Sequence, residues 1–506
     1  MAFTGTAAEA YALNAPRPKW ERPLHIALAL LTGVLLRLVF PEFDLRWLAA
    51  VALAPLLIAV AREERAAWRF LYGWLAGVVY WFSLCNWIEF VLEVHGGMGF
   101  WGGWACFALF SVLKAIHLGV FAWLAGPLMW RLYAIPAVAA LWAGLERTHA
   151  TFGFAWLDLG NAAINMSLPL RLAPVTGVYG ISFVFAMLAA AVAIVLLRYP
   201  RKFLWPLAAI LLLFLLPAIP RDRGMVRGAL VVQPNIDPEI TWTEGKQKRM
   251  EQDLEVVSDA WPARLVVWPE LPAPLYFYDD PVFHDEAVQI AKKHGYFLFG
   301  TVAYNENHQP LNSAVLLGPD GNVAGRYDKV NLVPFGEFIP PLFGFVNRIT
   351  QEAGDFAPGH SIEVMDAGAD KLGVFICYES AFPDFVRQFS KKGATVLFNL
   401  SNDAYFGHSA AREQHLLLVR MRAVENARYI VRSTNDGITA SIDPAGRIVQ
   451  ELPRYRESAG LLPFRAVSTL TPYVKYGDWF AWICLIIGIL LSIETQLASR
   501  VRRPRR

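Results

Sequence analysis

Long apolar stretches constrain this chain of 506 residues more than any other feature of its sequence. Runs such as "LHIALALLTGVLLRLVF" and "FVFAMLAAAVAIVLL" approach the roughly 20 residues that a helix needs to cross about 30 Å of hydrocarbon. A single run of this kind could be a buried core helix, but so many together exclude an ordinary soluble protein. We therefore predict eight membrane-spanning helices, at residues 24–40, 46–62, 70–92, 99–125, 130–146, 172–197, 203–219 and 478–494.

Residues 227 to about 465 have the composition of a globular domain, with Asp, Glu, Lys, Asn, Gly and Pro between short apolar runs. Strand-like runs alternate with helical patterns, which favours an α/β sandwich (αββα) with sheets buried on both faces. The segments "GPDGNVAG" and "DPAGRIV" are typical of hairpin turns. The predicted strands are 228–233, 264–270, 296–303, 313–318, 371–378, 395–400, 429–434 and 437–443, and the predicted helices are 245–260, 281–294, 381–390 and 411–426.

The charges of the short loops predict the orientation in the membrane. With a cytoplasmic N-terminus, the inside segments hold ten Lys and Arg residues and the outside loops hold three, which is a clear positive-inside bias. The first span lacks a small-residue cleavage site, so we expect it to remain as an anchor. The predicted order is a cytoplasmic segment (1–23), seven spans (24–219), an extracytoplasmic domain (220–470), a last span (471–496) and a basic cytoplasmic tail (497–506).

Cys377 is the single cysteine of the globular domain, because Cys85, Cys106 and Cys484 fall within predicted spans. Exported domains usually pair their cysteines in disulfides. An unpaired thiol in such a domain is either a small buried hydrophobic residue or a nucleophile. The cysteine count alone leaves both interpretations open.

Three polar residues stand at the ends of predicted strands or just beyond them. Glu270 follows "VVWP", Lys329 lies in "RYDKVNLVPFGEF", and Cys377 ends the apolar part of "KLGVFICYE". Ligands of α/β sheets collect beyond the carboxyl ends of strands, so these side chains could converge. The carboxylate can take the thiol proton, and the ammonium can stabilise the thiolate and then the oxyanion formed by attack on a carbonyl. The backbone N–H of Tyr378 would be a second oxyanion donor, and the product would be a thioester on Cys377.

At this point the motifs match a known family. In order and spacing, "VVWPE", "DKVNLVPFGEF" and "GVFICYES" resemble the glutamate–lysine–cysteine set of the nitrilase superfamily, and "LSNDAYFG" with "QHLLLVRMRAVENARYIVRSTNDGITASIDPAGRIV" extends the resemblance. A nitrilase-like domain between seven N-terminal spans and one C-terminal span resembles the apolipoprotein N-acyltransferases. The membrane segments "TFGFAWLDLGNA" and "LAPVTGVYGISF" are similar to that family as well, so the resemblance covers nearly the whole chain.

The resemblance implies a role for each matching residue. Glu270 would be the general base, Lys329 the ammonium that stabilises the oxyanion, and Cys377 the nucleophile. Glu337 would orient Lys329 or relay protons beside Glu270. Three residues are expected to support the site, through structure or through a chemical step: Glu337, Tyr378 and Glu379.

Aromatic residues are expected to contact the substrates. Tyr405 stands where the family more often carries Trp, an exchange that keeps an aromatic ring. The segment 334–349, "PFGEFIPPLFGFVNRI", is unusually apolar for an exported loop, and is either a mobile lid that dips into the bilayer or a loop packed on its own domain. The expected substrate-binding residues are Trp242, Phe338, Phe343 and Tyr405.

The implied reaction moves a fatty acyl chain from a phospholipid to Cys377, and then to the α-amine of the diacylglyceryl-cysteine that begins an apolipoprotein. An α-amine with a pKa near 7.7–8.0 is partly neutral, and hence nucleophilic, at the pH of the periplasm. We expect a monomer in the bacterial inner membrane whose globular domain is periplasmic, without cofactor or metal. The net charge of +3 is too small to suggest a nucleic-acid binder.

Two other functions compete with this one. A membrane-tethered amidase or nitrilase-type hydrolase could use the same three residues with water as the final acceptor, although it would need neither an apolar lid nor many spans. A transporter or scaffold could use the outer domain only for binding, and loss of Cys377 would then leave it unaffected.

Overall fold

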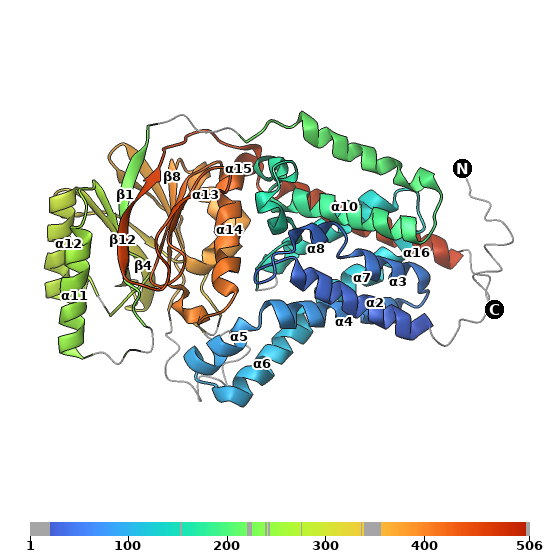
Figure 1. The fold of residues 1–506 in the computed structure, drawn as a ribbon, viewed down its shortest axis with the longest axis horizontal. Helices are drawn as coiled ribbons and strands as arrows, with labels where there is room; N and C mark the ends of the chain where they lie inside the picture. The colour runs from blue at the N-terminus through green and yellow to red at the C-terminus, as the bar shows by residue number, and fades with distance from the viewer. Residues whose placement is uncertain are drawn as a thin grey trace.

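The computed structural model describes residues 21–151, 154–219, 225–237, 240, 243–274, 276–334, 336–338 and 356–501. A bundle of apolar helices and an α/β sandwich lie end to end along the long axis of the molecule (Figure 1). The bundle is built from both ends of the chain, and the sandwich is built from the middle. This is the arrangement that the predicted insertion of a globular domain between spans requires.

The bundle has a helix at each predicted span. The N-terminal helices begin close to the predicted starts, and the last one, α16, returns from the sandwich to pack against α8. The helical segments are α2 (Glu21–Leu38), η1 (Arg46–Ala50), α3 (Ala54–Arg62), α4 (Ala66–Leu84), α5 (Trp87–Phe90), η2 (Val91–His95), α6 (Gly99–Lys114), α7 (Ile116–Leu128), α8 (Ala134–Thr151), η3 (Leu159–Asn165), η4 (Pro169–Leu172), α9 (Ala173–Thr176), α10 (Val178–Leu196), η5 (Arg201–Leu215) and α16 (Trp479–Val501).

The number of spans is confirmed only in part. Among the described residues, three helical stretches are long and apolar enough to cross a membrane: Gly99–Leu128, Val178–Leu196 and Trp479–Ala498. A fourth is possible if α4 and the segment Trp87–His95, which meet at 59°, form one bent span. The predicted spans 24–40 and 130–146 form the continuous 18-residue helices α2 and α8, which are less apolar than these stretches. The remaining predicted spans are shorter or interrupted. The span at 46–62, for example, consists of a 3₁₀ turn and the nine-residue helix α3.

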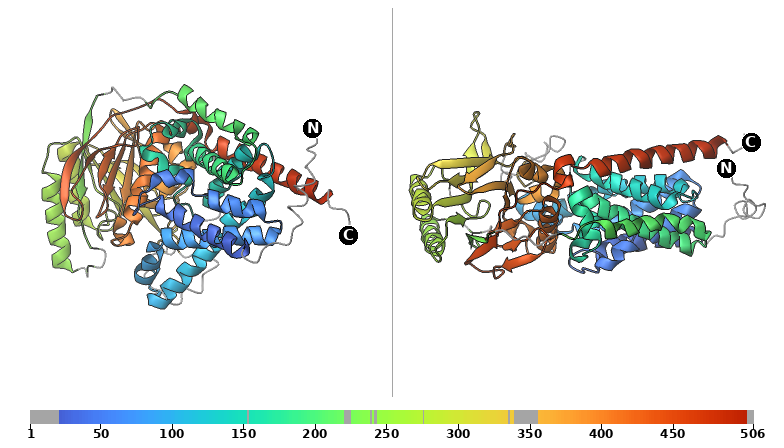
Figure 2. Two further views of the ribbon diagram at one scale, coloured as in Figure 1. Left: turned by 45° about the vertical axis from the view of Figure 1, so that its right-hand side comes forward. Right: turned by 90° about the horizontal axis from the view of Figure 1, so that it is seen from above.

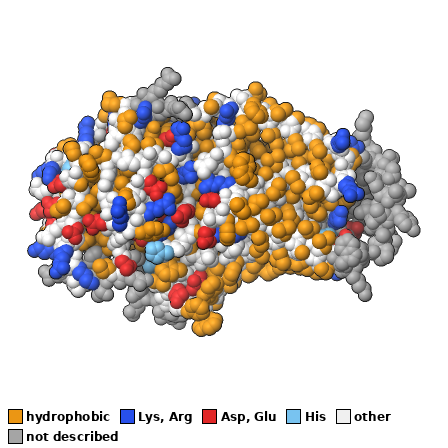
Figure 3. All heavy atoms as spheres, in the orientation of Figure 1, with side chains coloured by type: hydrophobic (Ala, Val, Ile, Leu, Met, Phe, Trp, Pro, Cys, Tyr) orange, Lys and Arg blue, Asp and Glu red, His pale blue; other side chains and the backbone are white. Residues whose placement is uncertain are grey.

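The surface of the bundle suits a hydrocarbon environment. Figure 3 shows a broad band of hydrophobic side chains over the bundle, while charged side chains gather on the sandwich and at the far end. Exposed hydrophobic residues of the bundle segments η5 and α16 include Trp205, Leu211, Ile486 and Leu490. In water such a surface would be costly, whereas in lipid it needs no further burial.

The sandwich consists of two six-stranded sheets. One has the order β12-β1-β2-β3-β4-β5, and the other has the order β11-β10-β9-β8-β7-β6. Both predicted hairpins are confirmed, since β4 pairs antiparallel with β5 and β10 with β11. The strands are β1 (Arg227–Gln233), β2 (Leu265–Val267), β3 (Tyr296–Tyr304), β4 (Pro310–Leu317), β5 (Val323–Asp328), β6 (Val364–Ala367), β7 (Asp370–Ile376), β8 (Val396–Ser401), β9 (Ile430–Thr434), β10 (Ala440–Ile442), β11 (Ile448–Glu451) and β12 (Ser458–Phe464).

Two helices cover each outer face of the sandwich, which gives four layers (Figures 1 and 2). We call the sheet that contains β1, together with its helices, the outer half, because it lies far from the bundle. We call the other sheet and its helices the inner half, because its helices face the bundle. The outer helices are α11 (Glu244–Ser258) and α12 (Pro281–His294), and the inner ones are α13 (Pro383–Lys391) and α14 (Ala411–Asn426).

Strand alternation divides the core of the outer half between two environments. On β1, Leu230 and Val232 pack toward α11 and α12 in a separate cluster with Trp268 and Phe283. The intervening Val231 faces the inner sheet and belongs to the large core that continues into the bundle. Period-two side-chain geometry explains this division, because neighbouring residues of a strand point to opposite faces.

Helix α14 joins the inner half to the bundle. The buried side chain of Gln414 accepts a hydrogen bond from Trp156 Nε1 at 2.7 Å and donates to the carbonyls of Pro41 at 3.1 Å and Leu84 at 3.2 Å. Glu425, near the end of the same helix, accepts from the backbone N–H of Val178 at 2.9 Å. A buried amide that bonds to three groups of the bundle is a rigid connection, since breaking it leaves the Trp156 indole and the Leu84 carbonyl without this partner, while the Pro41 carbonyl keeps its bond from Arg37.

Candidate active site

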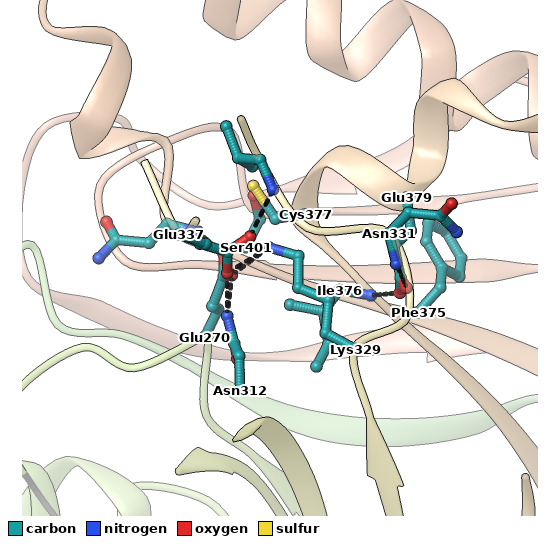
Figure 4. A network of polar contacts seen from close by, with 12 residues as sticks. Glu270, Asn312, Lys329, Asn331, Glu337, Phe375, Ile376, Cys377, Glu379 and Ser401 are labelled. Atoms are coloured by element: carbon teal, nitrogen blue, oxygen red, sulfur yellow. Dashed lines mark hydrogen bonds and ion pairs between the residues drawn. The ribbon is translucent and has the colours of Figure 1, made fainter. Parts of the chain in front are cut away.

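Figure 4 shows Glu270, Lys329 and Cys377 together between the two sheets. Glu270 follows β2, Lys329 follows β5, and Cys377 follows β7, so each comes from the carboxyl end of a different strand. The first two belong to the outer half and the third to the inner half. Facing sheets therefore bring these residues together across more than a hundred positions of sequence.

Lys329 is held between two carboxylates. Its Nζ donates to Oε1 of Glu270 and to Oε1 of Glu337, each at 2.9 Å, and its side chain is 1% exposed. Burial lowers the pKa of the Lys329 ammonium, but the two carboxylates outweigh burial and raise this pKa well above its usual value. Lys329 is therefore a fixed positive charge inside the site.

Backbone and amide donors fix both carboxylates. Asn312 Nδ2 donates to Glu270 Oε1 at 2.9 Å and to Glu337 Oε1 at 2.6 Å, so it joins the two acids. The other oxygen of Glu270 accepts from the backbone N–H of Asn402 at 3.0 Å, and that of Glu337 accepts from Val333 at 2.8 Å. Preorganised donors of this kind hold the acids in one orientation before any substrate arrives.

Cys377 sits on a sharp turn between β7 and the 3₁₀ helix η8 (Cys377–Ala381). Its φ is +48°, a left-handed conformation that a residue other than glycine seldom adopts. Burial raises the pKa of the Cys377 thiol above its ordinary value; the Glu270 carboxylate raises it further, and Lys329 opposes both. The resting group is therefore a thiol that needs a base to become nucleophilic.

Glu379 braces the turn from within. Its carboxylate accepts from Tyr327 Oη at 2.6 Å, from the backbone N–H of Val330 at 2.8 Å and from that of Ile376 at 2.7 Å. Burial raises the pKa of Glu379 to about 7, while these donors favour the charged form. The geometry ties the Cys377 turn to the segment that carries Lys329.

The side chain of Tyr378 points toward the bundle. Its hydroxyl accepts from the backbone N–H of Ala155 at 3.2 Å, and its ring stacks near Phe154 and Trp156. The residue next to Cys377 is thus anchored to a loop between α8 and η3. Its backbone N–H stays a predicted oxyanion donor.

The four predicted substrate-binding residues differ in how the structure places them. Tyr405 is 42% exposed, and its ring centroid lies 4.4 Å from that of His95 in η2, so it links the sandwich to the bundle. Phe338 is half-buried and lies one residue after Glu337. Trp242 and Phe343 lie outside the described residues, as does the predicted lid except for residues 334 and 336–338.

Sequence reasoning missed several residues that shape the site. Asn312 precedes the predicted strand at 313–318 by one residue, and Asn402 and Asp403 lie in "LSNDAYFG", which entered only through the family resemblance. His415 lies in the middle of α14, a helix in which nearly every residue is buried. The signal for Asn312 was a polar residue at the edge of an apolar strand, whereas nothing in the helical pattern singles out His415.

Family models match both parts of the chain. The carbon–nitrogen hydrolase model matches residues 229–464, and the model of the apolipoprotein N-acyltransferase N-terminal domain matches residues 32–191. The fold and the matches thus define a carbon–nitrogen hydrolase-type domain carried on a helical membrane bundle.

Full-length relatives agree with this class. An apolipoprotein N-acyltransferase of Geobacter metallireducens is 34% identical over 90% of this chain and 92% of its own length. One of Methylococcus capsulatus is 32% identical over 93% of this chain and 97% of its own. The chain belongs to the apolipoprotein N-acyltransferase family. Among solved structures, an amidase from Nesterenkonia sp. AN1 matches 50% of this chain and 97% of its own, at 19% identity and a TM-score of 0.38.

Proposed function

We propose that this protein transfers a fatty acyl chain from a phospholipid to the α-amine of the diacylglyceryl-cysteine at the start of an apolipoprotein, through a thioester on Cys377. The observation that carries the proposal is the Lys329 ammonium, buried between two carboxylates beside a lone thiol. Family membership supplies the substrate class. The geometry supports the proposal because a carboxylate, a fixed ammonium and a thiol lie together, as a base, a positive charge and a nucleophile would need to.

The first half-reaction forms the thioester. Glu270 takes the proton of the Cys377 thiol as sulfur attacks the ester carbonyl of the phospholipid. An ammonium has three N–H donors; two point to Glu270 and Glu337, and we assign the third to the oxyanion. When the carbon–oxygen bond breaks, Glu270 returns the proton to the departing lysophospholipid oxygen.

The second half-reaction releases the acyl chain as an amide. The neutral α-amine attacks the thioester carbonyl, the carbon–sulfur bond breaks, and Glu270 accepts the proton that the amine loses. That proton then returns to the Cys377 sulfur, which restores the resting thiol. In this cycle Glu337 and Asn312 are positioning residues, because they hold Lys329 and Glu270 in place.

The proposal includes a placement in the cell. All eight predicted helical segments cross or enter the bacterial inner membrane, the sandwich within 220–470 is periplasmic, and both termini are cytoplasmic. The hydrophobic band of Figure 3 and the loop charges support this placement. Lipid-anchored substrates can then reach the site from the plane of the bilayer.

The test is the intact mass of the purified protein after incubation with phospholipid. We expect the wild type to gain one fatty-acyl mass, which hydroxylamine and a diacylglyceryl lipopeptide both remove. Cys377→Ser should gain no thiol-labile mass, whereas the matched control Cys106→Ser, which alters a cysteine of the bundle, should behave as the wild type. An adduct lost to water as fast as to the lipopeptide would instead identify a hydrolase.

A further inference from the structure

A chain of buried polar side chains ends on the backbone of Cys377. His415, on α14, is 0% exposed, and its Nε2 lies 3.0 Å from the carbonyl oxygen of Cys377. Its Nδ1 lies 2.9 Å from Oδ1 of Asp403, which also forms an ion pair with Arg432. None of these three groups enters the reaction described above.

The direction of the contact follows from the chemistry of its atoms. A carbonyl oxygen can only accept, so the N–H at Nε2 of His415 donates a hydrogen bond to the carbonyl oxygen of Cys377. Asp403 holds the other side of the ring, and the rings of Trp156 and Phe406 lie 6.1 and 5.7 Å from the imidazole centroid. The ring is therefore fixed in position.

The inner sheet anchors this arrangement. Ser401, the last residue of β8, donates to Asp403 at 2.8 Å. Arg432, on β9, donates to Asn399 Oδ1 at 2.7 Å and to the carbonyl of Ile438 at 3.1 Å. Two neighbouring strands therefore set the place of Asp403, and Asp403 sets the place of His415.

The contact falls where the backbone most needs support. At φ +48° the peptide after Cys377 is turned away from the strand direction, and a non-glycine residue keeps that conformation only when its surroundings impose it. The turn decides where the sulfur lies relative to Glu270 and Lys329. A group that fixes the carbonyl of Cys377 also fixes the path of the nucleophile.

We propose that His415, held by Asp403, is a positioning residue that locks the left-handed turn of Cys377 and thereby aligns its sulfur for acylation. The inference rests on the proposed function of Cys377. A positioning role differs from a purely structural role of His415, because a structural role would affect the stability of the fold without a specific effect on the acylation rate.

The test compares two substitutions of similar size. His415→Gln keeps an N–H donor that can reach the Cys377 carbonyl, whereas His415→Met keeps the volume and loses the donor. Single-turnover acylation by phospholipid would be followed by intact mass, with thermal unfolding recorded for each variant. We expect His415→Met to lower the acylation rate about a hundredfold and to leave the KM for phospholipid within about threefold of wild type. His415→Gln should acylate at least about tenfold faster than His415→Met.

Asn426→Leu is the matched control. Asn426 is buried on the same helix, and its amide donates to the carbonyl of Arg422. Its replacement therefore removes a buried polar group that does not contact Cys377. It should leave the acylation rate within about threefold. Equal losses for His415→Gln and His415→Met, or no loss for either, would overturn the inference.

Further outcomes test the positioning role of His415 separately from the proposed function. If His415→Met does not accumulate as folded protein, Asp403→Asn weakens the hold on the ring while Nε2 still faces Cys377, and it should slow acylation about tenfold; an unchanged rate contradicts the inference. If the wild type forms no adduct on Cys377, the proposed function fails and this inference falls with it. A wild-type adduct with equal losses in both His415 variants rejects the positioning role alone.

Discussion

In the outer half of the sandwich, the sheet that contains β1 carries Glu270, Lys329 and Asn312, and it packs on α11 and α12 through a core of its own. In the inner half, the other sheet carries Cys377 at the end of β7, and its core continues into the helices of the bundle. Glu270 and Lys329 thus come from the half that lies far from the bundle. Cys377, the proposed nucleophile, comes from the half that is fixed to the bundle.

This difference separates two demands on the enzyme. The acyl donor is anchored in a bilayer, so the atom that attacks it has to keep a constant position relative to the helices. Gln414 and Tyr378 provide that link, because both bond directly to segments of the bundle. In the proposed reaction Glu270 and Lys329 act on Cys377 rather than on the lipid anchor, and both reach Cys377 from the facing sheet.

The largest effect is expected from removing the positive charge of Lys329 in the outer half. Lys329→Met should slow acylation at least about a thousandfold, because it removes the donor assigned to the oxyanion. It also leaves two buried carboxylates facing each other, which should cost about 3–5 kcal/mol of unfolding free energy. Intact-mass kinetics and thermal unfolding measure both. Lys371→Met, which alters an exposed lysine 3.6 Å from Asp366, is the control; acylation by Lys329→Met within tenfold of wild type would contradict the assignment.

The second prediction separates the base from the charge. Glu270→Gln should slow acylation roughly a hundred- to ten-thousandfold, because the thiol loses its general base. The same change should speed alkylation of Cys377 by iodoacetamide at a given pH, because the Glu270 carboxylate raises the pKa of the thiol and its removal lowers that pKa.

The wild-type alkylation rate should keep rising between about pH 7 and pH 9, since burial places the pKa of Cys377 above that of an ordinary thiol. The exposed Glu255→Gln on α11 is the control and should match the wild type in both assays. If Glu270→Gln slowed acylation and alkylation equally, it would point to a disturbed fold rather than a lost base.

The third prediction concerns the attachment of the inner half. Gln414→Leu removes the partner of the Trp156 indole N–H and of the Leu84 carbonyl, and one of the two donors to the Pro41 carbonyl, which keeps its bond from Arg37. It should therefore lower the free energy of unfolding by about 3 kcal/mol. Thermal unfolding in detergent measures the change. Gln247→Leu on α11 removes a bond to Glu251 in the outer half and should cost less than about 0.5 kcal/mol. Similar losses for the two variants would remove the distinction between the halves.

The smallest effect is expected at Tyr405. Tyr405→Trp keeps an aromatic ring against His95 and should change the acylation rate by less than about twofold. Tyr405→Ala removes that ring contact and should cost about 1 kcal/mol of unfolding free energy. Both are measured by the assays above. If Tyr405→Ala slowed acylation while its unfolding free energy fell by no more than this amount, the result would assign the ring to substrate contact.

The strand-end residues could be predicted because each stands where an apolar run gives way to a polar side chain. The turn at Cys377 and its contact with His415 could not, since they depend on the packing of α14 between a sheet and the bundle. Helix periodicity indicates one buried face, but α14 is buried on nearly all sides, so its polar residues carry no positional signal.

The membrane part shows the same limit. Hydropathy located a helical segment at each apolar run, but only three stretches of the described residues, or four with the bent pair, are long and apolar enough to cross a membrane. It did not predict the bend between α4 and α5, where the chain turns by 59° within the predicted span 70–92. Asn86 stands at that break, and a polar residue inside an apolar run was the available signal.

The pairing of β1 with β12 joins the first and last strands of the sandwich, with Arg227 opposite Phe464. The ribosome makes β12 after every other strand, so β1 has an open edge until the rest of the domain has been synthesised. The outer sheet closes only a few residues before α15 (Pro472–Tyr476) and α16 emerge. The outer half is therefore completed at nearly the same time as α16 is synthesised. A nascent chain stopped before Ser458 has neither a complete outer sheet nor α16.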